Sequence, residues 1–143
     1  MKRELLIAIF VGFCTVQVCA QILDNSSEAF KRAEETGKPV LLIFSGSDWC
    51  APCIRFSKNV LTQETFLDYA ADHLILLKAD FPQRKRLADD LRKQNETLAE
   101  RYNPSGQFPH ILLLHADGTV ISILSYRNQK PEEFISQLSS HFA

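Results

Sequence analysis

Apolar residues in this chain follow two patterns that take turns along the sequence. Helical spacing and cap residues predict helices over residues 24–36, 50–60, 63–71, 85–102 and 131–141. Apolar runs of strand length predict strands over residues 40–44, 74–79, 109–115 and 119–125. The first two strands are each followed by helix, whereas the last two are adjacent in sequence.

This order of elements indicates an α/β fold. Helical connections imply that the first two strands are parallel, because such a crossover returns the chain in the same direction. Asp117-Gly118 is a strong signal for a tight turn, so the last two strands form an antiparallel hairpin. The sequence therefore predicts a mixed four-stranded sheet, two parallel strands plus a hairpin, flanked by helices.

The N-terminal segment has the pattern of a secretory signal. Lys2 and Arg3 precede an apolar stretch, and Val18-Cys19-Ala20 offers a cleavage position, so residues 1–20 are predicted to be removed and residues 21–143 to form one domain. The apolar stretch is short for a permanent membrane span, which needs about 20 apolar residues. We therefore expect a periplasmic or secreted protein.

Charge adds little that is specific. The chain has 16 basic and 17 acidic residues, a net charge of −1, which gives no indication of nucleic-acid binding. The basic cluster Arg84-Lys85-Arg86 lies among acidic residues and is predicted to be a solvated helix face. After cleavage only Cys50 and Cys53 remain, too few for a fold held together by several disulfides.

The cysteine pair is the strongest candidate for chemistry. Trp49-Cys50-Ala51-Pro52-Cys53 is predicted to open a helix directly after a strand and a short loop. Unpaired backbone N–H groups and the helix dipole at that position favour the thiolate, which is the nucleophilic form of cysteine. Pro52 is tolerated in a first turn, because its missing N–H would have no intrahelical partner. An incidental bridge across this short spacing is the plainer alternative.

The segment Ser47-Asp48-Trp49-Cys50-Ala51-Pro52-Cys53, together with Phe108-Pro109 at the opening of the third strand, resembles the thioredoxin-like superfamily. The likeness is greatest to secreted bacterial proteins described as disulfide reductases or isomerase-like. It implies that Pro109 is cis and faces the cysteines. It also implies that Phe108 presents backbone groups to an extended substrate and that Trp49 shields the site, although Trp49 also suits a packing role.

Two positions depart from the family pattern. Phe44 occupies the place, six residues before Cys50, where thioredoxins have a buried carboxylate. Asp48 or a water molecule is a possible substitute, while a loop-capping role is the simpler reading of Asp48. His110 follows the proline, where a small or β-branched residue is common. It either contacts substrate or is a partly exposed strand histidine.

The resemblance implies a thiol–disulfide oxidoreductase without a cofactor other than its own Cys50–Cys53 disulfide. Cys50, exposed at the helix start, attacks a client disulfide, and the less accessible Cys53 resolves the mixed disulfide. Ala-Pro between the cysteines resembles the Gly-Pro of reducing thioredoxins and lacks the histidine of oxidases and isomerases. We therefore expect a reductase that acts as a monomer on exported client proteins and receives electrons from a membrane protein.

Three alternatives remain open at this level. The same fold serves thiol oxidases and isomerases. A copper- or zinc-binding module is a second possibility, with Cys50, Cys53 and either His110 or His73 as ligands, although zinc sites usually need four ligands. The third is a peptide-binding domain in which the cysteine pair is a static bridge.

Overall fold

The computed structural model describes residues 19–142, and its centre is a mixed sheet of five strands in the order β1-β3-β2-β4-β5. β1, β3 and β2 run parallel, whereas β4 is antiparallel to β2 and β5 is antiparallel to β4. The strands are β1 (Ile22–Leu23), β2 (Val40–Ser45), β3 (Ile75–Asp80), β4 (His110–Leu114) and β5 (Val120–Leu124).

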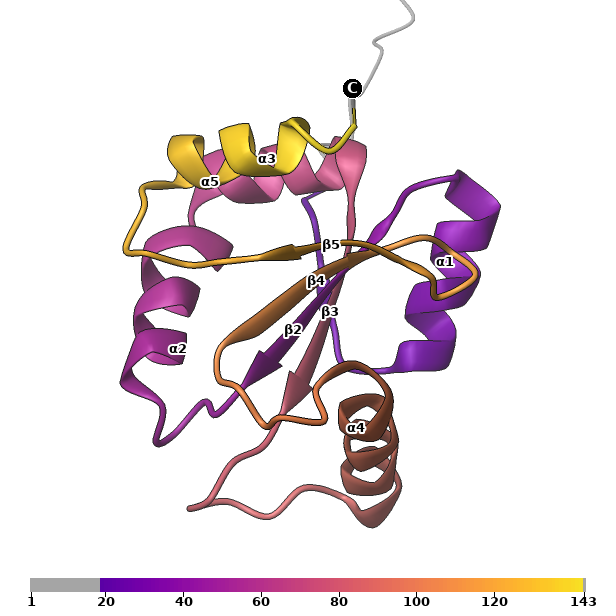
Figure 1. The fold of residues 1–143 in the computed structure, drawn as a ribbon, viewed down its shortest axis with the longest axis vertical. Helices are drawn as coiled ribbons and strands as arrows, with labels where there is room; N and C mark the ends of the chain where they lie inside the picture. Colours follow the sequence, from indigo (N-terminus) through magenta and orange to yellow (C-terminus); the bar gives the residue numbers. More distant parts are fainter. Residues whose placement is uncertain (1–18, 143) are drawn as a thin grey trace, which may run out of the picture.

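Helices cover both faces of the sheet (Figure 1). α1 and α4 pack on one face, and α2, α3 and α5 pack on the other, each face with its own apolar core. A π-helix continues α2 without a break. The helical elements are α1 (Ser26–Thr36), α2 (Ala51–Phe56), η1 (Ser57–Leu61), α3 (Glu64–His73), α4 (Asp89–Tyr102) and α5 (Pro131–Ser139).

The position of the central strand β2 explains why its sequence is apolar without alternation. All six of its residues are buried, because successive side chains point into the two different cores. Leu41 and Ile43 join the core beneath α2, α3 and α5, whereas Leu42 and Phe44 join the core beneath α1 and α4. β2 is therefore fixed on both sides, and its last residue, Ser45, delivers the chain to the site described below.

The predicted α/β class and mixed sheet are confirmed, but the strand count was wrong. The fifth strand, β1, pairs in parallel with β3 through Ile22↔Leu76 and Leu23↔Leu77. A strand of two residues is too short to show a period in sequence, so only its pairing partner reveals it. The predicted signal segment, residues 1–20, lies almost wholly outside the described residues.

A second correction concerns the helix predicted over residues 85–102, which begins only at Asp89. Residues 81–88 form a loop between β3 and α4, so Arg84, Lys85 and Arg86 lie on this loop and not on a helix face. The backbone N–H groups of Gln83 and Arg84 are bound by the side chain of Asp48, which holds this part of the chain out of helical geometry. Within residues 19–142, none of the helices is both long and apolar enough to cross a bilayer.

Candidate functional site

The site is built on the loop that joins β2 to α2. The backbone N–H groups of Trp49 and Cys50 donate to the carbonyl oxygen of Gly46 at 3.3 and 2.9 Å, which folds residues 46–50 into a tight turn. Cys50 then caps α2, and its Sγ accepts the N–H of Cys53 at 3.3 Å. Pro52 lies in the first turn of α2, as predicted.

Cys50 and Cys53 form a disulfide with their Cα atoms 5.2 Å apart. Cys50 is 5% exposed and Cys53 is 2% exposed, so Cys50 is less accessible than the exposed position expected from the sequence. The reason is its role as helix cap, which turns the side chain back toward the first turn of α2. Of the two sulfur-bearing residues, Cys50 is still the one nearer to solvent.

Pro109 lies at the same edge of the sheet as the disulfide. The Phe108–Pro109 peptide bond is cis, as the resemblance implied. This bond leads directly into β4, whose first residue, His110, is in register with Phe44 of β2. Phe44 in turn lies four positions before Asp48 in the sequence. The antiparallel pairing of β4 with β2 therefore brings the cis proline beside the end of β2, from which the loop to Cys50 departs.

Three aromatic side chains, Trp49, Phe81 and Phe108, form an aromatic cluster at this edge. Trp49 and Phe108 meet edge to face with ring centroids 5.4 Å apart, and Phe81 and Phe108 meet in the same way at 5.6 Å. The indole N–H of Trp49 donates to the carbonyl oxygen of Phe81 at 2.7 Å. Trp49 is 38% exposed, so it is a fixed surface residue and not a core residue.

Asp48 does not replace the missing buried carboxylate. Its two oxygens accept the backbone N–H groups of Gln83 and Arg84 at 2.9 and 2.8 Å, so the loop-capping interpretation is correct. The place of the family carboxylate is filled by the ring of Phe44, which is fully buried and lies 6.1 Å from the ring of His110. The proton of Cys53 therefore has no carboxylate acceptor at position 44.

The segment before the cysteines is tied to the end of β3 residue by residue. The backbone N–H and hydroxyl of Ser47 donate to the carboxylate of Asp80 at 3.0 and 2.6 Å. Asp48 binds the two N–H groups described above, and Trp49 binds the carbonyl of Phe81. We call these bonds of residues 47–49 the latch. The latch holds the loop of residues 81–88 against the turn that carries Cys50.

The pKa of the Asp48 carboxyl gives a prediction about the latch. The N–H of Gln83 is the main cause that holds this pKa below 3.8, its ordinary value. Because the pKa is lowered by folding, the stabilising effect is complete above pH 3.8 and is lost as the pH falls through the lower, folded value. We expect the amide NMR signals of Gln83 and Arg84 to shift with a midpoint below pH 3.8.

The matched control for this titration is Asp48→Asn, which keeps the shape of the side chain but has no proton to lose near that pH. In this variant the low-pH transition of the two amides should be absent. A wild-type midpoint at or above 3.8 would show that the carboxylate does not hold the loop.

A cavity lies beside Cys53. Its volume is about 300 Å³, and Cys53 lines it together with Ser45, Ser47 and Lys78. Lys78 belongs to β3 and is in register with Ile43 of β2. We did not predict Lys78 or Phe81 as site residues, although a lysine within the apolar run of residues 74–79 is a signal that was available in the sequence.

The two candidate histidines occupy different places. His110 is half-buried, and its Nε2–H donates to the carbonyl oxygen of Tyr102 at 3.1 Å, so it is a strand histidine with a backbone partner. Burial lowers the pKa of His110 below 6.5. His73 ends α3 and stacks on Tyr69, just before β3 begins, and thus lies at the opposite edge of the sheet from Cys50. No cluster of three potential metal ligands is found within residues 19–142.

Comparison with known proteins finds a matching family model and two similar proteins in sequence. The family model described as thioredoxin-like matches residues 21–116. The disulfide bond reductase DsbH of Chlamydia pneumoniae is 28% identical over 117 residues, which cover 82% of this chain and 70% of DsbH. The thioredoxin-related protein DsbJ of the same organism is 28% identical over 102 residues, which cover 71% of this chain and 29% of DsbJ.

Solved structures show the same fold. The DsbH oxidoreductase superposes with a TM-score of 0.80 at 24% identity, covering 99% of this chain and 94% of that one. The C-terminal domain of Neisseria meningitidis DsbD superposes with a TM-score of 0.55 at 21% identity, covering 80% and 90%. With a matching family model over most of its length, a Cys50–Cys53 disulfide and a cis Phe108–Pro109 bond, the chain belongs to the thioredoxin-like family and is a thiol–disulfide oxidoreductase.

Proposed function

We propose that this protein works as a reductase, which transfers two electrons from its Cys50–Cys53 dithiol to disulfides of exported client proteins. The observation that carries the proposal is the cysteine pair at the start of α2, with only Ala51 and Pro52 between the two sulfur-bearing residues. Neither Ala51 nor Pro52 has a side chain that stabilises a thiolate by positive charge, as a histidine would. The dithiol form is therefore less favoured than in an oxidase, and the protein gives electrons up more readily.

The reaction begins with the thiolate of Cys50. Its sulfur attacks one sulfur of the client disulfide, so that a mixed disulfide forms and the other client sulfur leaves as a thiolate. The N–H of Cys53, which donates to Cys50 Sγ, favours the charged form of the attacking sulfur. Trp49 and Phe108 offer the client an apolar surface, and the backbone beside Pro109 lies where an extended segment would pass.

The second step releases the product. Cys53 loses its proton and attacks Cys50 Sγ, so that the Cys50–Cys53 disulfide forms and the second client sulfur leaves as a thiolate. No carboxylate lines the cavity beside Cys53, so the proton of Cys53 passes to solvent in this step. A dithiol donor then reduces the Cys50–Cys53 disulfide again. For an exported protein, this donor is a membrane protein.

Two measurements test the proposal, the first the exchange activity and the second the direction of electron flow. We expect the purified protein to accelerate the reduction of insulin by dithiothreitol. The potential of the Cys50–Cys53 couple should lie below about −200 mV, toward the value of about −270 mV for thioredoxin. A potential of about −120 mV or above, as in strong oxidases, would contradict the reductase assignment. The oxidoreductase family assignment would remain intact.

A further inference from the structure

Exposed apolar side chains flank the cysteine pair on both sides in the sequence. Trp49 directly precedes Cys50, and Ile54 directly follows Cys53. Among residues 19–142, the large apolar residues that are exposed are Trp49, Ile54, Val120, Ile123 and Phe142. Ile54 is 45% exposed and belongs to neither apolar core, so packing within the protein does not explain an isoleucine at this position.

Helix geometry places the side chain of Ile54 over the turn that carries Cys50. The backbone N–H of Ile54 donates to the carbonyl oxygen of Cys50 at 3.0 Å, so the two residues are one turn apart. Residues four positions apart lie on the same face of a helix, and a helical side chain leans toward the N-terminus. Ile54 also lines the cavity beside Cys53, which Ser47 of the preceding turn lines as well. A client segment that reaches Cys50 therefore meets Ile54.

The local structure of α2 does not require isoleucine at position 54. β-branched residues are less favourable in a helix than alanine, lysine or glutamine, which suit an exposed helical position. A single exposed isoleucine is common on protein surfaces, but this one lies within one helical turn of the reactive sulfur. Its place beside the nucleophile points to a contact with the client.

Trp49 and Phe108 form a second apolar contact at the site. Their ring centroids are 5.4 Å apart, and neither residue lines the cavity that Ile54 lines. The apolar surface around the reactive sulfur therefore has two separate parts, one from the aromatic cluster and one from Ile54. An extended segment whose cystine reaches Cys50 contacts both parts when it has bulky apolar residues beside its cysteine.

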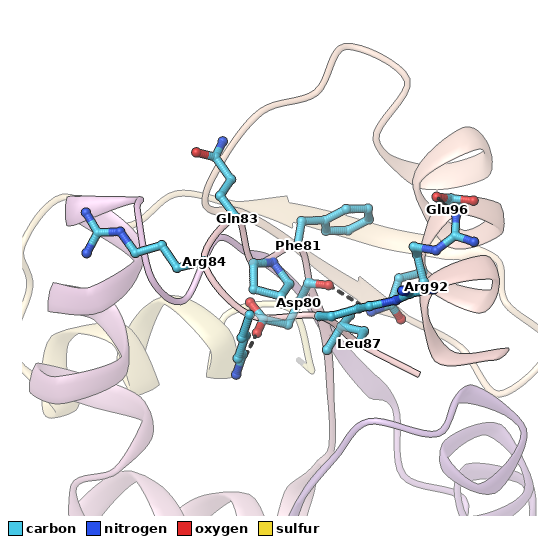
Figure 2. A pocket seen from close by; sticks show the side chains of 11 residues that line it. Asp80, Phe81, Gln83, Arg84, Leu87, Arg92 and Glu96 are labelled. Atoms are coloured by element: carbon cyan, nitrogen blue, oxygen red, sulfur yellow. Dashed lines mark hydrogen bonds and ion pairs between the residues drawn. The ribbon is translucent and has the colours of Figure 1, made fainter. Parts of the chain in front are cut away.

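Charge gives no comparable preference near the site. The loop of residues 81–88 borders a cavity of about 470 Å³, and the cations on and beside this loop lie among acidic side chains (Figure 2). Lys85 lies 3.6 Å from Asp80, and Arg92 lies 2.9 Å from Glu96. Because carboxylates match these cations, selection of clients at this site depends on the apolar contacts.

We propose that Ile54 is a specificity-determining residue, which favours client disulfides with a bulky apolar residue beside the attacked cysteine. This inference rests on the proposed function, since it names the client class of the same site. Bulky apolar residues are mostly buried in folded proteins, so the favoured clients are unfolded or partly unfolded segments. The exchange itself is that described above, with two electrons passing from the dithiol to the client cystine.

Two synthetic peptides with the same internal disulfide test the proposal directly. One has leucine on each side of both cysteines, and the other has glutamine at these positions. With the wild-type protein we expect kcat/KM to be about tenfold higher for the leucine peptide, mainly through KM, because burial of apolar area strengthens binding. The ratio should not fall as sodium chloride is raised from about 0.02 to about 0.5 M, because salt screens charges and not apolar contacts.

Ile54→Gln should lower this leucine-to-glutamine ratio to about threefold, the remainder coming from the aromatic cluster, and Ile54→Leu should restore it. The matched control, Val120→Gln, removes an apolar side chain of similar exposure at the opposite end of the sheet and should keep the wild-type ratio. Because Ile54 lies outside both cores, the midpoint of thermal unfolding of Ile54→Gln should stay within about 3 °C of the wild-type value.

Three results would overturn the role of Ile54 alone. They are equal wild-type rates for both peptides, a ratio that Ile54→Gln leaves unchanged or that Val120→Gln lowers equally, and a larger fall in the thermal midpoint, which would assign Ile54 to packing. Failure of the wild-type protein to reduce either peptide would instead contradict the proposed function.

Discussion

Replacement of Cys50 by serine should abolish disulfide reduction, with a loss of at least about a thousandfold in rate. A serine hydroxyl does not ionise near neutral pH and forms no disulfide, so neither the first nor the second exchange step can take place. The measurement is insulin reduction with dithiothreitol as electron source. The Cys50→Ser protein should run at the rate of dithiothreitol alone.

Replacement of Cys53 by serine should have a different result. Cys50 still attacks, but nothing within the protein resolves the mixed disulfide, so the client remains covalently attached. Non-reducing electrophoresis and mass spectrometry of peptides should find adducts on Cys50. Because Cys53 is only 2% exposed, it should not form such adducts itself in the Cys50→Ser protein.

In protein that keeps residues 1–20, Cys19 provides the control for both variants. It is an exposed free thiol with no place in the site, so Cys19→Ser should keep wild-type activity and give no adducts. Residual reduction by Cys50→Ser, or adducts of Cys53→Ser on a residue other than Cys50, would assign the chemistry to another group.

The local pattern of apolar and turn residues was sufficient to predict most of the fold. The long helices and the central strands have periods that a single sequence displays, and Asp117-Gly118 marks the turn of the hairpin correctly, with Gly118 at a φ of +82°. Elements whose form depends on partners elsewhere were missed. β1 exists only as a neighbour of β3, and the predicted helical start at residue 85 is prevented by Asp48, which is 35 positions away from Gln83.

The same distinction applies to the site. Cys50, Cys53 and Pro109 were found because they belong to short motifs with a fixed spacing. Lys78 and Phe81 were not found, because their relation to the cysteines arises from the register of β3 beside β2 and from the bond of Trp49 to Phe81, 32 positions along the chain. Long-range hydrogen bonds of this kind leave no period in the sequence.

Gly46 shows how tightly the latch and the turn before Cys50 are packed. A Cβ atom added at this position would lie 2.3 Å from Cε2 of Trp49 and 2.6 Å from its Nε1. The backbone of Gly46 has an ordinary φ, so the requirement for glycine is set by the indole ring alone. That ring is rigid and is held by its bond to Phe81 and its contact with Phe108.

Gly46→Ala should therefore push the indole out of the aromatic cluster and break its bond to Phe81. We expect a loss of about 1–3 kcal/mol in the free energy of unfolding, as for other overpacked sites, and about a tenfold loss in kcat/KM for clients. Trp49 is the single tryptophan of the chain, so its fluorescence reports the displacement directly as a shift to longer wavelength.

A double-mutant cycle separates the steric cause from a general effect of alanine on the turn. In a Trp49→Ala background the added methyl group meets no ring, so Gly46→Ala should change the free energy of unfolding by less than about 0.5 kcal/mol. An equal cost in both backgrounds would mean that the backbone, and not the indole, requires glycine. The cycle thus tests whether the order of the site depends on the packing of one ring against one backbone position.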